Sequence, residues 1–89
     1  MSESSESVVW LPADVDLHAR PAARFVRTAL GFNANVQVFA ADRRADAKSL
    51  LAVLALGARR GTALTLSAEG PDADRAVAAL TACVAGLVE

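Results

Sequence analysis

The chain has 89 residues, which suffices for one domain with a modest core, and 54% of the residues are apolar while 4% are aromatic. Its net charge of −1 and its few aromatic side chains argue against nucleic-acid binding, because that function needs a basic surface and stacking platforms. The single cysteine, Cys83, has no second cysteine with which to form a disulfide or a thiolate metal site. We expect it to be a buried small apolar residue in a helix.

The N-terminal residues 1–7 are polar and acidic, so we expect a disordered tail ahead of a single domain over residues 8–89. This segment lacks the basic region and apolar run of a secretion signal, and no stretch is long enough to span a bilayer. Both observations favour a cytoplasmic protein. Residues 8–11 are apolar and β-branched and are followed by Pro12, which predicts a strand in which Trp10 is a packing residue.

A first helix is predicted to begin at or near His18 and to end at Leu30. Pro21 suits a first helical turn, and Gly31 provides a C-terminal cap. The apolar residues that recur at helical spacing are Ala22, Phe25, Val26, Ala29 and Leu30, while Arg24, Arg27 and Thr28 point away from that face.

The remaining elements follow from changes in hydrophobic period. Residues 34–40 alternate as a strand with one covered face, and residues 44–47 form a short partner strand at an edge. Ser49 is the expected N-cap of a helix over residues 50–56 that ends at Gly57. A strand over residues 62–68 precedes a helix that Asp72 caps and whose apolar repeat runs to Val88. The order predicts an α+β fold: a four-stranded antiparallel sheet with three helices on one face.

The only histidine, His18, stands directly ahead of the first helix. The first backbone N–H groups of a helix lack intrahelical partners and the helix dipole is positive there, so an anion is favoured beside His18. Arg20 can add a bidentate guanidinium for phosphate oxygens. By itself, this short pattern also fits a capping histidine next to a solvated arginine.

The sequence Leu-His-Ala-Arg-Pro-Ala-Ala at residues 17–23, followed by Phe25 and Val26, resembles the active-site signature of the HPr family. This family comprises the histidine-containing phosphocarriers of the bacterial phosphotransferase system. The resemblance extends over roughly residues 8 to 88 and includes a second signature at residues 47–51 and matches at residues 56–57, 61–62 and 67–70.

The resemblance implies an open-faced β-sandwich, whereas the order of elements alone also fits a ferredoxin-like module. It implies that His18 takes a phosphoryl group from Enzyme I and passes it to Enzyme IIA domains, with Arg20 stabilising the phosphate. Such a protein is a carrier rather than an enzyme, and it needs no cofactor or metal. A monomer is the default expectation for its oligomeric state. Partner docking is expected at the apolar stretch that contains Leu50, Leu51 and Leu54 and at the basic residues Arg24 and Arg27.

Ser49 has two interpretations. A helix N-cap needs no further role, but in some family members the matching serine is phosphorylated by a dedicated kinase, and a phosphorylase is then a further partner.

The chain departs from the family at Val15 and Asp16, where HPr proteins usually have a small polar residue and a glycine. The carboxylate of Asp16 could repel a phosphoryl group or compete for Arg20, and Val15 cannot donate a side-chain hydrogen bond. The alternatives are therefore an HPr-like carrier in a nitrogen-related or dihydroxyacetone kinase system, or a regulatory module that only holds an anion. A free-standing enzyme is disfavoured by the lone histidine and by the lack of a glycine-rich nucleotide loop.

Overall fold

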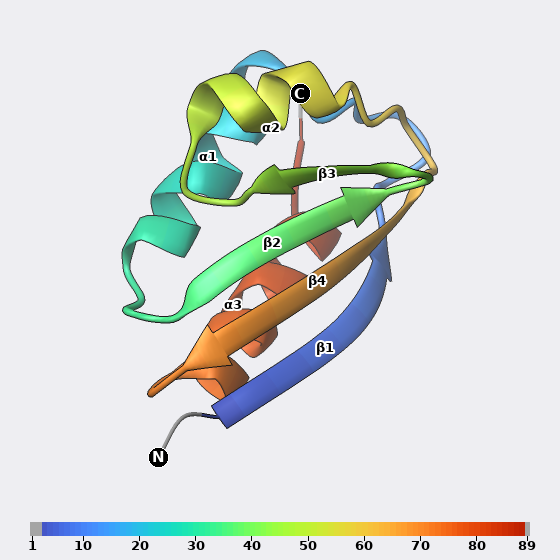
Figure 1. Ribbon diagram of the computed structural model, residues 1–89. Helices are drawn as coiled ribbons and strands as arrows, with labels where there is room; N and C mark the ends of the chain where they lie inside the picture. Colours follow the sequence, from blue (N-terminus) through green and yellow to red (C-terminus); the bar gives the residue numbers. More distant parts are fainter. Residues whose placement is uncertain (1–2, 89) are drawn as a thin grey trace.

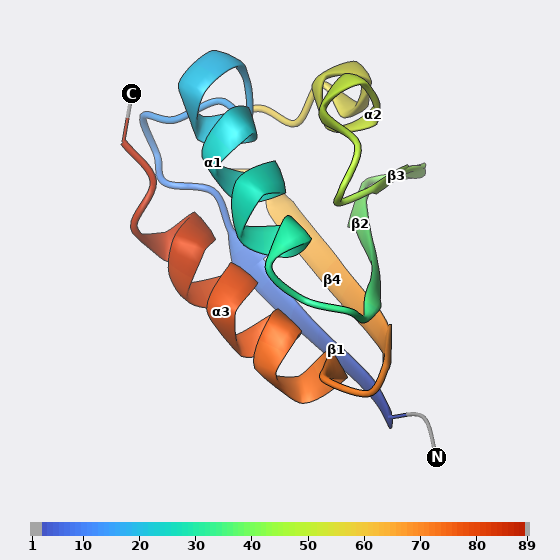
Figure 2. The same ribbon diagram turned by 90° about the vertical axis from the view of Figure 1, so that its left-hand side faces the viewer.

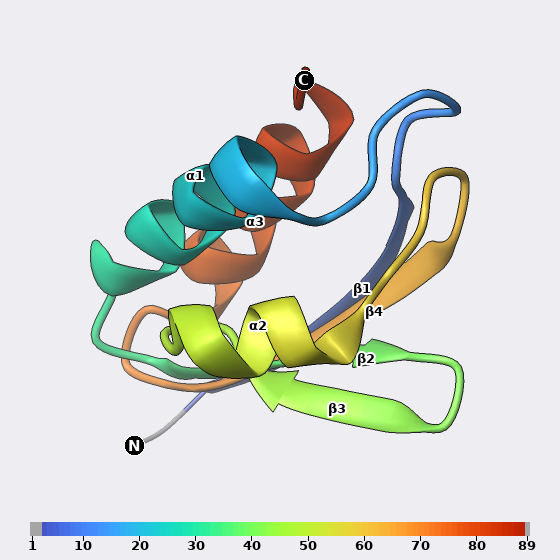
Figure 3. The ribbon, with the colours of Figure 1, turned by 90° about the horizontal axis from the view of Figure 1, so that it is seen from above.

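Four antiparallel strands form one sheet in the order β1-β4-β2-β3 in the computed structural model, which describes residues 3–88 (Figure 1). The strands are β1 (Glu3–Trp10), β2 (Asn35–Ala40), β3 (Arg43–Asp46) and β4 (Ala63–Gly70). The helices are α1 (Ala19–Leu30), α2 (Leu50–Leu56) and α3 (Ala73–Ala85). All three helices cover the same face of the sheet, which confirms the predicted fold class and element order (Figure 3).

The core lies between this face of the sheet and the helices. Helix α3 packs over β1 and β4, α2 packs over β3, and α1 lies against both other helices (Figure 2). Alternate residues of the two central strands point into the core, as the period of two predicted. They are Val36, Val38 and Ala40 in β2 and Leu64, Leu66 and Ala68 in β4. Within residues 3–88, none of the helices has the length and apolar character needed to cross a membrane.

Strand β1 is longer than predicted. The disordered tail expected over residues 1–7 is wrong for residues 3–7, which pair with β4 from Glu3 opposite Gly70 onward, while residues 1–2 lie outside the described residues. Ser4 and Glu6 lie on the face of the sheet that is open to solvent, where backbone pairing requires no apolar side chain, while Ser5 and Ser7 lie on the same face as Val9 and are half-buried. Trp10 also points to the open face and is 62% exposed, which corrects its prediction as a packing residue; its neighbour Val9 faces the core.

The first and last helices differ from the predictions at their C-terminal ends. Helix α1 has the predicted bounds and Gly31 as its C-cap, but Leu30 in its last turn is 60% exposed and not part of the buried face. Helix α3 ends at Ala85 with Gly86 as the capping residue, so the predicted helical repeat does not continue to Val88. Leu87 remains buried beyond the helix, whereas Val88 is exposed.

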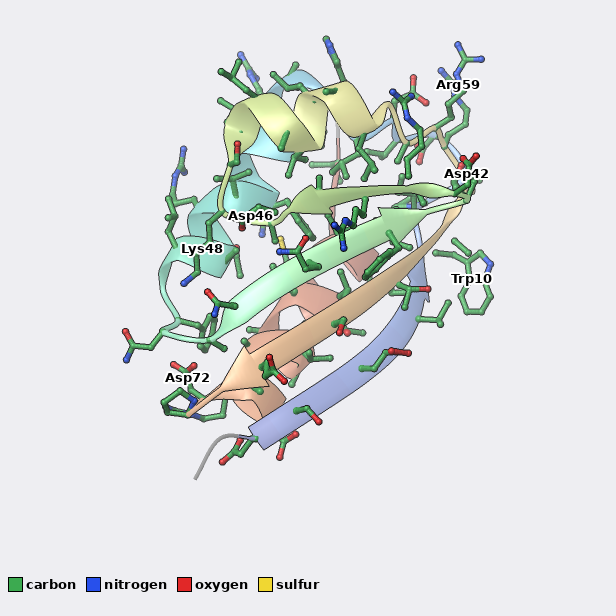
Figure 4. The ribbon with its side chains drawn as sticks, in the orientation of Figure 1. Trp10, Asp42, Asp46, Lys48, Arg59 and Asp72 are labelled. Carbon is green, nitrogen blue, oxygen red and sulfur yellow. The ribbon has the colours of Figure 1, made fainter. Side chains whose placement is uncertain are left out.

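Asp72 begins α3 as predicted, but its side chain does not cap that helix. Its carboxylate accepts the backbone N–H of Asn33 at 2.9 Å and that of Ala34 at 2.7 Å. These bonds, above all the one from Asn33, lower the pKa of Asp72. At the same corner, Gly70 (φ 134°) approaches Ala34 so closely that a Cβ would lie 3.1 Å from its Cα. Asp72 therefore fastens the α1–β2 loop to the start of α3 (Figure 4).

Candidate functional site

His18 is the N-cap residue of α1, with extended backbone angles, an exposed side chain and no capping hydrogen bond from its imidazole. The first turn of a helix presents backbone N–H groups without intrahelical acceptors, and the helix dipole adds positive charge. In α1 the first bond back to the N-cap is that of the Ala22 N–H to the His18 carbonyl, at 3.4 Å. The imidazole therefore stands beside a position that favours an anion.

The backbone next to His18 is strained. Ala19, the first residue of α1, has φ 47°, in the left-handed region that costs an L-residue about 1–2 kcal/mol. Two bonds hold the preceding turn: the His18 N–H donates to the Asp16 carbonyl at 2.9 Å, and the Leu17 N–H donates to the Ala58 carbonyl at 2.9 Å. The turn before α1 thus fixes the direction in which the helix and His18 point.

Arg20 shares a surface hollow with His18. The hollow has a volume of about 420 Å³ and is lined by Asp16, His18, Ala19, Arg20 and Pro21. The structure thus places His18 and Arg20 around one hollow at the start of α1. This combination can accept an anionic group at the imidazole and neutralise its charge.

Asp16 has Arg60 as its ion-pair partner. Its Oδ1 accepts the Arg60 backbone N–H at 2.8 Å, and its Oδ2 lies 3.4 Å from Nη2 of the same residue. These contacts, the backbone bond first, lower the pKa of Asp16. We expected the Asp16 carboxylate to compete for Arg20. Its ion pair is instead with Arg60, and this pair joins the β1–α1 loop to the α2–β4 loop. The other departure from the family, Val15, is buried in the core.

The basic residues of α1 lie together. Arg20, Arg24 and Arg27 line one hollow of about 350 Å³ with Ala23. Arg24 and Arg27 are exposed, as predicted, and extend the positive surface of the site along the helix.

Ser49 caps α2 as predicted, because its Oγ accepts the backbone N–H of Ala52 at 3.2 Å. Ser49 does not lie beside His18. The opposite end of α2, at Gly57 and Ala58, lines a hollow with His18, so the length of the helix, about 10 Å, separates Ser49 from the site.

The apolar stretch on α2 is exposed in part. Leu51 is 81% exposed and Leu50 is 41% exposed, while Leu54 is half-buried against the core.

Cys83 is half-buried rather than buried, and the Thr28 hydroxyl of α1 donates to its Sγ at 3.5 Å. Within residues 3–88, no group of three or more His, Cys, Asp or Glu residues is arranged so that it could hold a metal ion.

Arg59 and Arg60 lie between the predicted helix over residues 50–56 and the predicted strand over residues 62–68, and they were not predicted as site residues. Arg59 lines a hollow of about 250 Å³ with His18 and Asp16, and it lines another with Asp16 and Arg60. The available signal was a pair of arginines directly behind the C-terminal end of a helix, where the dipole favours cations.

Known proteins resemble this chain over nearly its whole length. The family model described as "PTS HPr component phosphorylation site" matches residues 6–86. The phosphocarrier protein HPr of Vibrio cholerae is 46% identical over 77 residues, which are 86% of this chain and 91% of that protein. The multiphosphoryl transfer protein of Xanthomonas campestris is 51% identical over 73 residues, which are 82% of this chain and 8% of that protein.

The fold is also that of HPr structures. The crystal structure of the phosphocarrier protein HPr from Bacillus anthracis matches with a TM-score of 0.86 and 33% identity, covering 91% of this chain and 96% of that one. Sequence and structure agree over the same span of the molecule. The chain therefore belongs to the HPr family, the phosphocarriers of the phosphotransferase system.

Proposed function

We propose that this protein relays a phosphoryl group through His18, which accepts it from a phosphohistidine of Enzyme I and passes it to an Enzyme IIA domain. The observation that carries this proposal is the exposed imidazole at the start of α1, in one hollow with Arg20. Both transfers are expected in the cytoplasm, and no cofactor is needed.

The chemistry of transfer suits this open site. Phosphoryl transfer depends on positioning and charge neutralisation more than on covalent work by the protein. The start of α1 and Arg20 supply positive charge on one side of the imidazole, while the exposed side leaves room for a partner's nucleophile. A shallow site also releases its group readily, as a carrier must.

The surface around the site is suited to docking. Arg24 and Arg27 can steer acidic partners, and Leu50 and Leu51 offer exposed apolar contacts on the neighbouring helix α2. The Xanthomonas relative, in which the matching segment is 8% of a multiphosphoryl transfer protein, supports a role beside other phosphotransfer domains.

Ser49 is the proposed regulatory residue of this surface. It is half-exposed and stands at the start of α2, where the helix dipole tolerates a phosphate. A dianion there would lie next to Leu50 and would oppose the docking of acidic partners.

The test is to incubate the protein with phosphoenolpyruvate, magnesium and Enzyme I and to measure its intact mass beside a His18→Ala variant. We expect an acid-labile gain of one phosphoryl group that the variant lacks. The variant should fold, because the His18 side chain is exposed and makes no capping bond. Failure of the cognate Enzyme I to charge a folded parent would refute the relay and favour a module that only binds an anion.

A further inference from the structure

The α2–β4 loop is fastened to the segment that carries His18. The two loops, residues 11–18 and 57–62, run side by side (Figure 3). Three backbone bonds join them: Leu11 N–H to Thr62 C=O at 2.9 Å, Leu17 N–H to Ala58 C=O at 2.9 Å, and Gly61 N–H to Pro12 C=O at 3.1 Å. The bond from the Arg60 N–H to Asp16 is a fourth link.

Arg59 lies between two of these links. The residue before it, Ala58, accepts from Leu17, and the residue after it, Arg60, donates to Asp16. Its backbone is thereby held beside the turn that precedes α1, and its side chain projects outward at this corner of the molecule (Figure 4). His18 lines one hollow with Arg20 and a second hollow with Arg59, so each of these two hollows beside His18 has an arginine in its lining.

The charge of Asp16 is offset by its neighbour. An ionised carboxylate two residues from His18 would repel a phosphoryl group, but Arg60 binds it with both its backbone N–H and its guanidinium. Asp16 therefore works as an anchor for the loop, and Arg59 adds a further positive charge beside His18.

We propose that Arg59 is a second phosphate-binding cation of the His18 site and that Asp16 is the positioning residue that holds its loop in place. This inference rests on the proposed function of His18. In the transfer, the bond from phosphorus to the donor imidazole breaks with its electron pair left on the donor ring, while a ring nitrogen of His18 forms the new bond. During transfer, the negative charge of the phosphoryl group is spread over its three oxygens. Arg20 can contact two of them as a bidentate pair, and Arg59 reaches the group from the other side.

The first experiment measures single-turnover phosphorylation by phospho-Enzyme I as a function of donor concentration. We expect Arg59→Gln to lower the saturating rate by about five- to tenfold, with the half-saturating concentration little changed, because it removes a contact made to the group in transfer. Arg59→Lys should recover part of the rate. Arg44→Gln, an equal loss of charge on exposed strand β3, is the matched control and should change neither quantity.

The second experiment isolates positioning by comparing Asp16→Asn with Asp16→Ala. Both remove the charge, but only asparagine keeps an oxygen that can accept the Arg60 N–H. We expect Asp16→Ala to be about threefold slower than Asp16→Asn, and we expect this difference to disappear in an Arg59→Gln background, since Asp16 acts through Arg59.

The outcomes separate this inference from the proposed function. A parent that Enzyme I does not charge would refute the relay itself. A parent that is charged, with Arg59→Gln either equal to Arg44→Gln or altered only in half-saturating concentration, would leave the relay intact and overturn the role of Arg59 at the phosphoryl group. A difference between the Asp16 variants that persists without Arg59 would overturn the positioning role.

Discussion

Helices α1 and α3 begin in opposite ways. At the start of α3, Asp72 is buried and its carboxylate is bound by the amides of Asn33 and Ala34. At the start of α1, His18 is exposed, its imidazole makes no capping bond, and Ala19 has a strained φ of 47°. One N-cap side chain is committed to holding the fold, while the other is left available for a ligand. Neither side chain caps its own helix, so the contrast is that Asp72 is already bound to the α1–β2 loop, whereas the exposed imidazole stands beside helix amides that can bind an anion.

Helix α2 stands between these cases. Its N-cap, Ser49, satisfies one amide of its own helix, yet the side chain remains half-exposed. The three helix starts therefore differ in whether the N-cap side chain already accepts hydrogen bonds from the protein. Mutation of each N-cap region tests this difference.

The largest effect on stability is expected at Asp72. Asp72→Ala removes the acceptor of two buried or partly buried amides, and we expect it to lower Tm by roughly 5–10 °C. Asp72→Asn keeps one acceptor oxygen, so we expect its Tm to lie between those of the alanine variant and the parent. Thermal unfolding followed by circular dichroism measures both, and an alanine variant as stable as the parent would show that these bonds do not fasten the α1–β2 loop.

The same residue gives a dependence on pH. The pKa of Asp72 is lowered in the folded state, so its stabilisation is present above the ordinary carboxyl value of about 3.9 and is lost as the pH falls through the folded value. The difference in free energy of unfolding between parent and Asp72→Ala should be constant from about pH 5 upward and should shrink below about pH 3.9. Urea unfolding across this range measures it. A difference that grows in acid would contradict the assigned sign.

At the start of α1 the expected effect is on transfer and not on stability. Arg20→Gln should slow the charging of His18 at least about tenfold, because it removes the guanidinium in the same hollow. Tm should stay within about 1–2 °C of the parent, since Arg20 is exposed. Arg24→Gln, one turn further along α1, is the control and should mainly raise the half-saturating concentration of the partner. Equal loss of the saturating rate in both variants would indicate that Arg20 acts only in docking.

The sequence was sufficient for those parts of the fold that depend on local pattern. The period of two in β2, the helical spacing of α1 and the cap at Ser49 were each predicted and are each present. The predicted first strand began at residue 8, because residues 3–7 are polar and show no apolar pattern that predicts a strand. Only their pairing with β4 makes them part of β1. Trp10 was misplaced for a related reason, since its side of the strand depends on which face the helices cover.

The site was predictable to the extent that it lies in one short segment. His18 and Arg20 are neighbours in sequence, and the helix start between them is readable from Pro21. Arg59 and Arg60 come from a loop more than forty residues away, and only the hydrogen bonds between the loops bring them to Asp16. No local pattern could show that Asp16 would find its partner there and not at Arg20.

At the start of α2 a smaller effect on stability is expected. Ser49→Ala removes the oxygen that accepts the Ala52 N–H and should lower the free energy of unfolding by about 1 kcal/mol. Ser49→Thr keeps a hydroxyl and is the control, with most of the stability retained. Chemical denaturation measures both variants. If alanine and threonine proved equal to the parent, the capping bond would contribute nothing, and the presence of Ser49 would then need another cause, such as modification.

The smallest effect is expected at Ala19, and its sign is the informative part. Glycine relieves the left-handed strain of about 1–2 kcal/mol but adds about 0.5–1 kcal/mol of backbone entropy to the unfolded chain, so Ala19→Gly should stabilise by up to about 1.5 kcal/mol. Ala23→Gly, inside α1, should destabilise by about 1 kcal/mol. Denaturant unfolding of both variants measures this contrast. Opposite signs for one chemical change in one helix would locate the strain at the residue after His18, whereas a loss of stability in both would mean that Ala19 carries no excess strain.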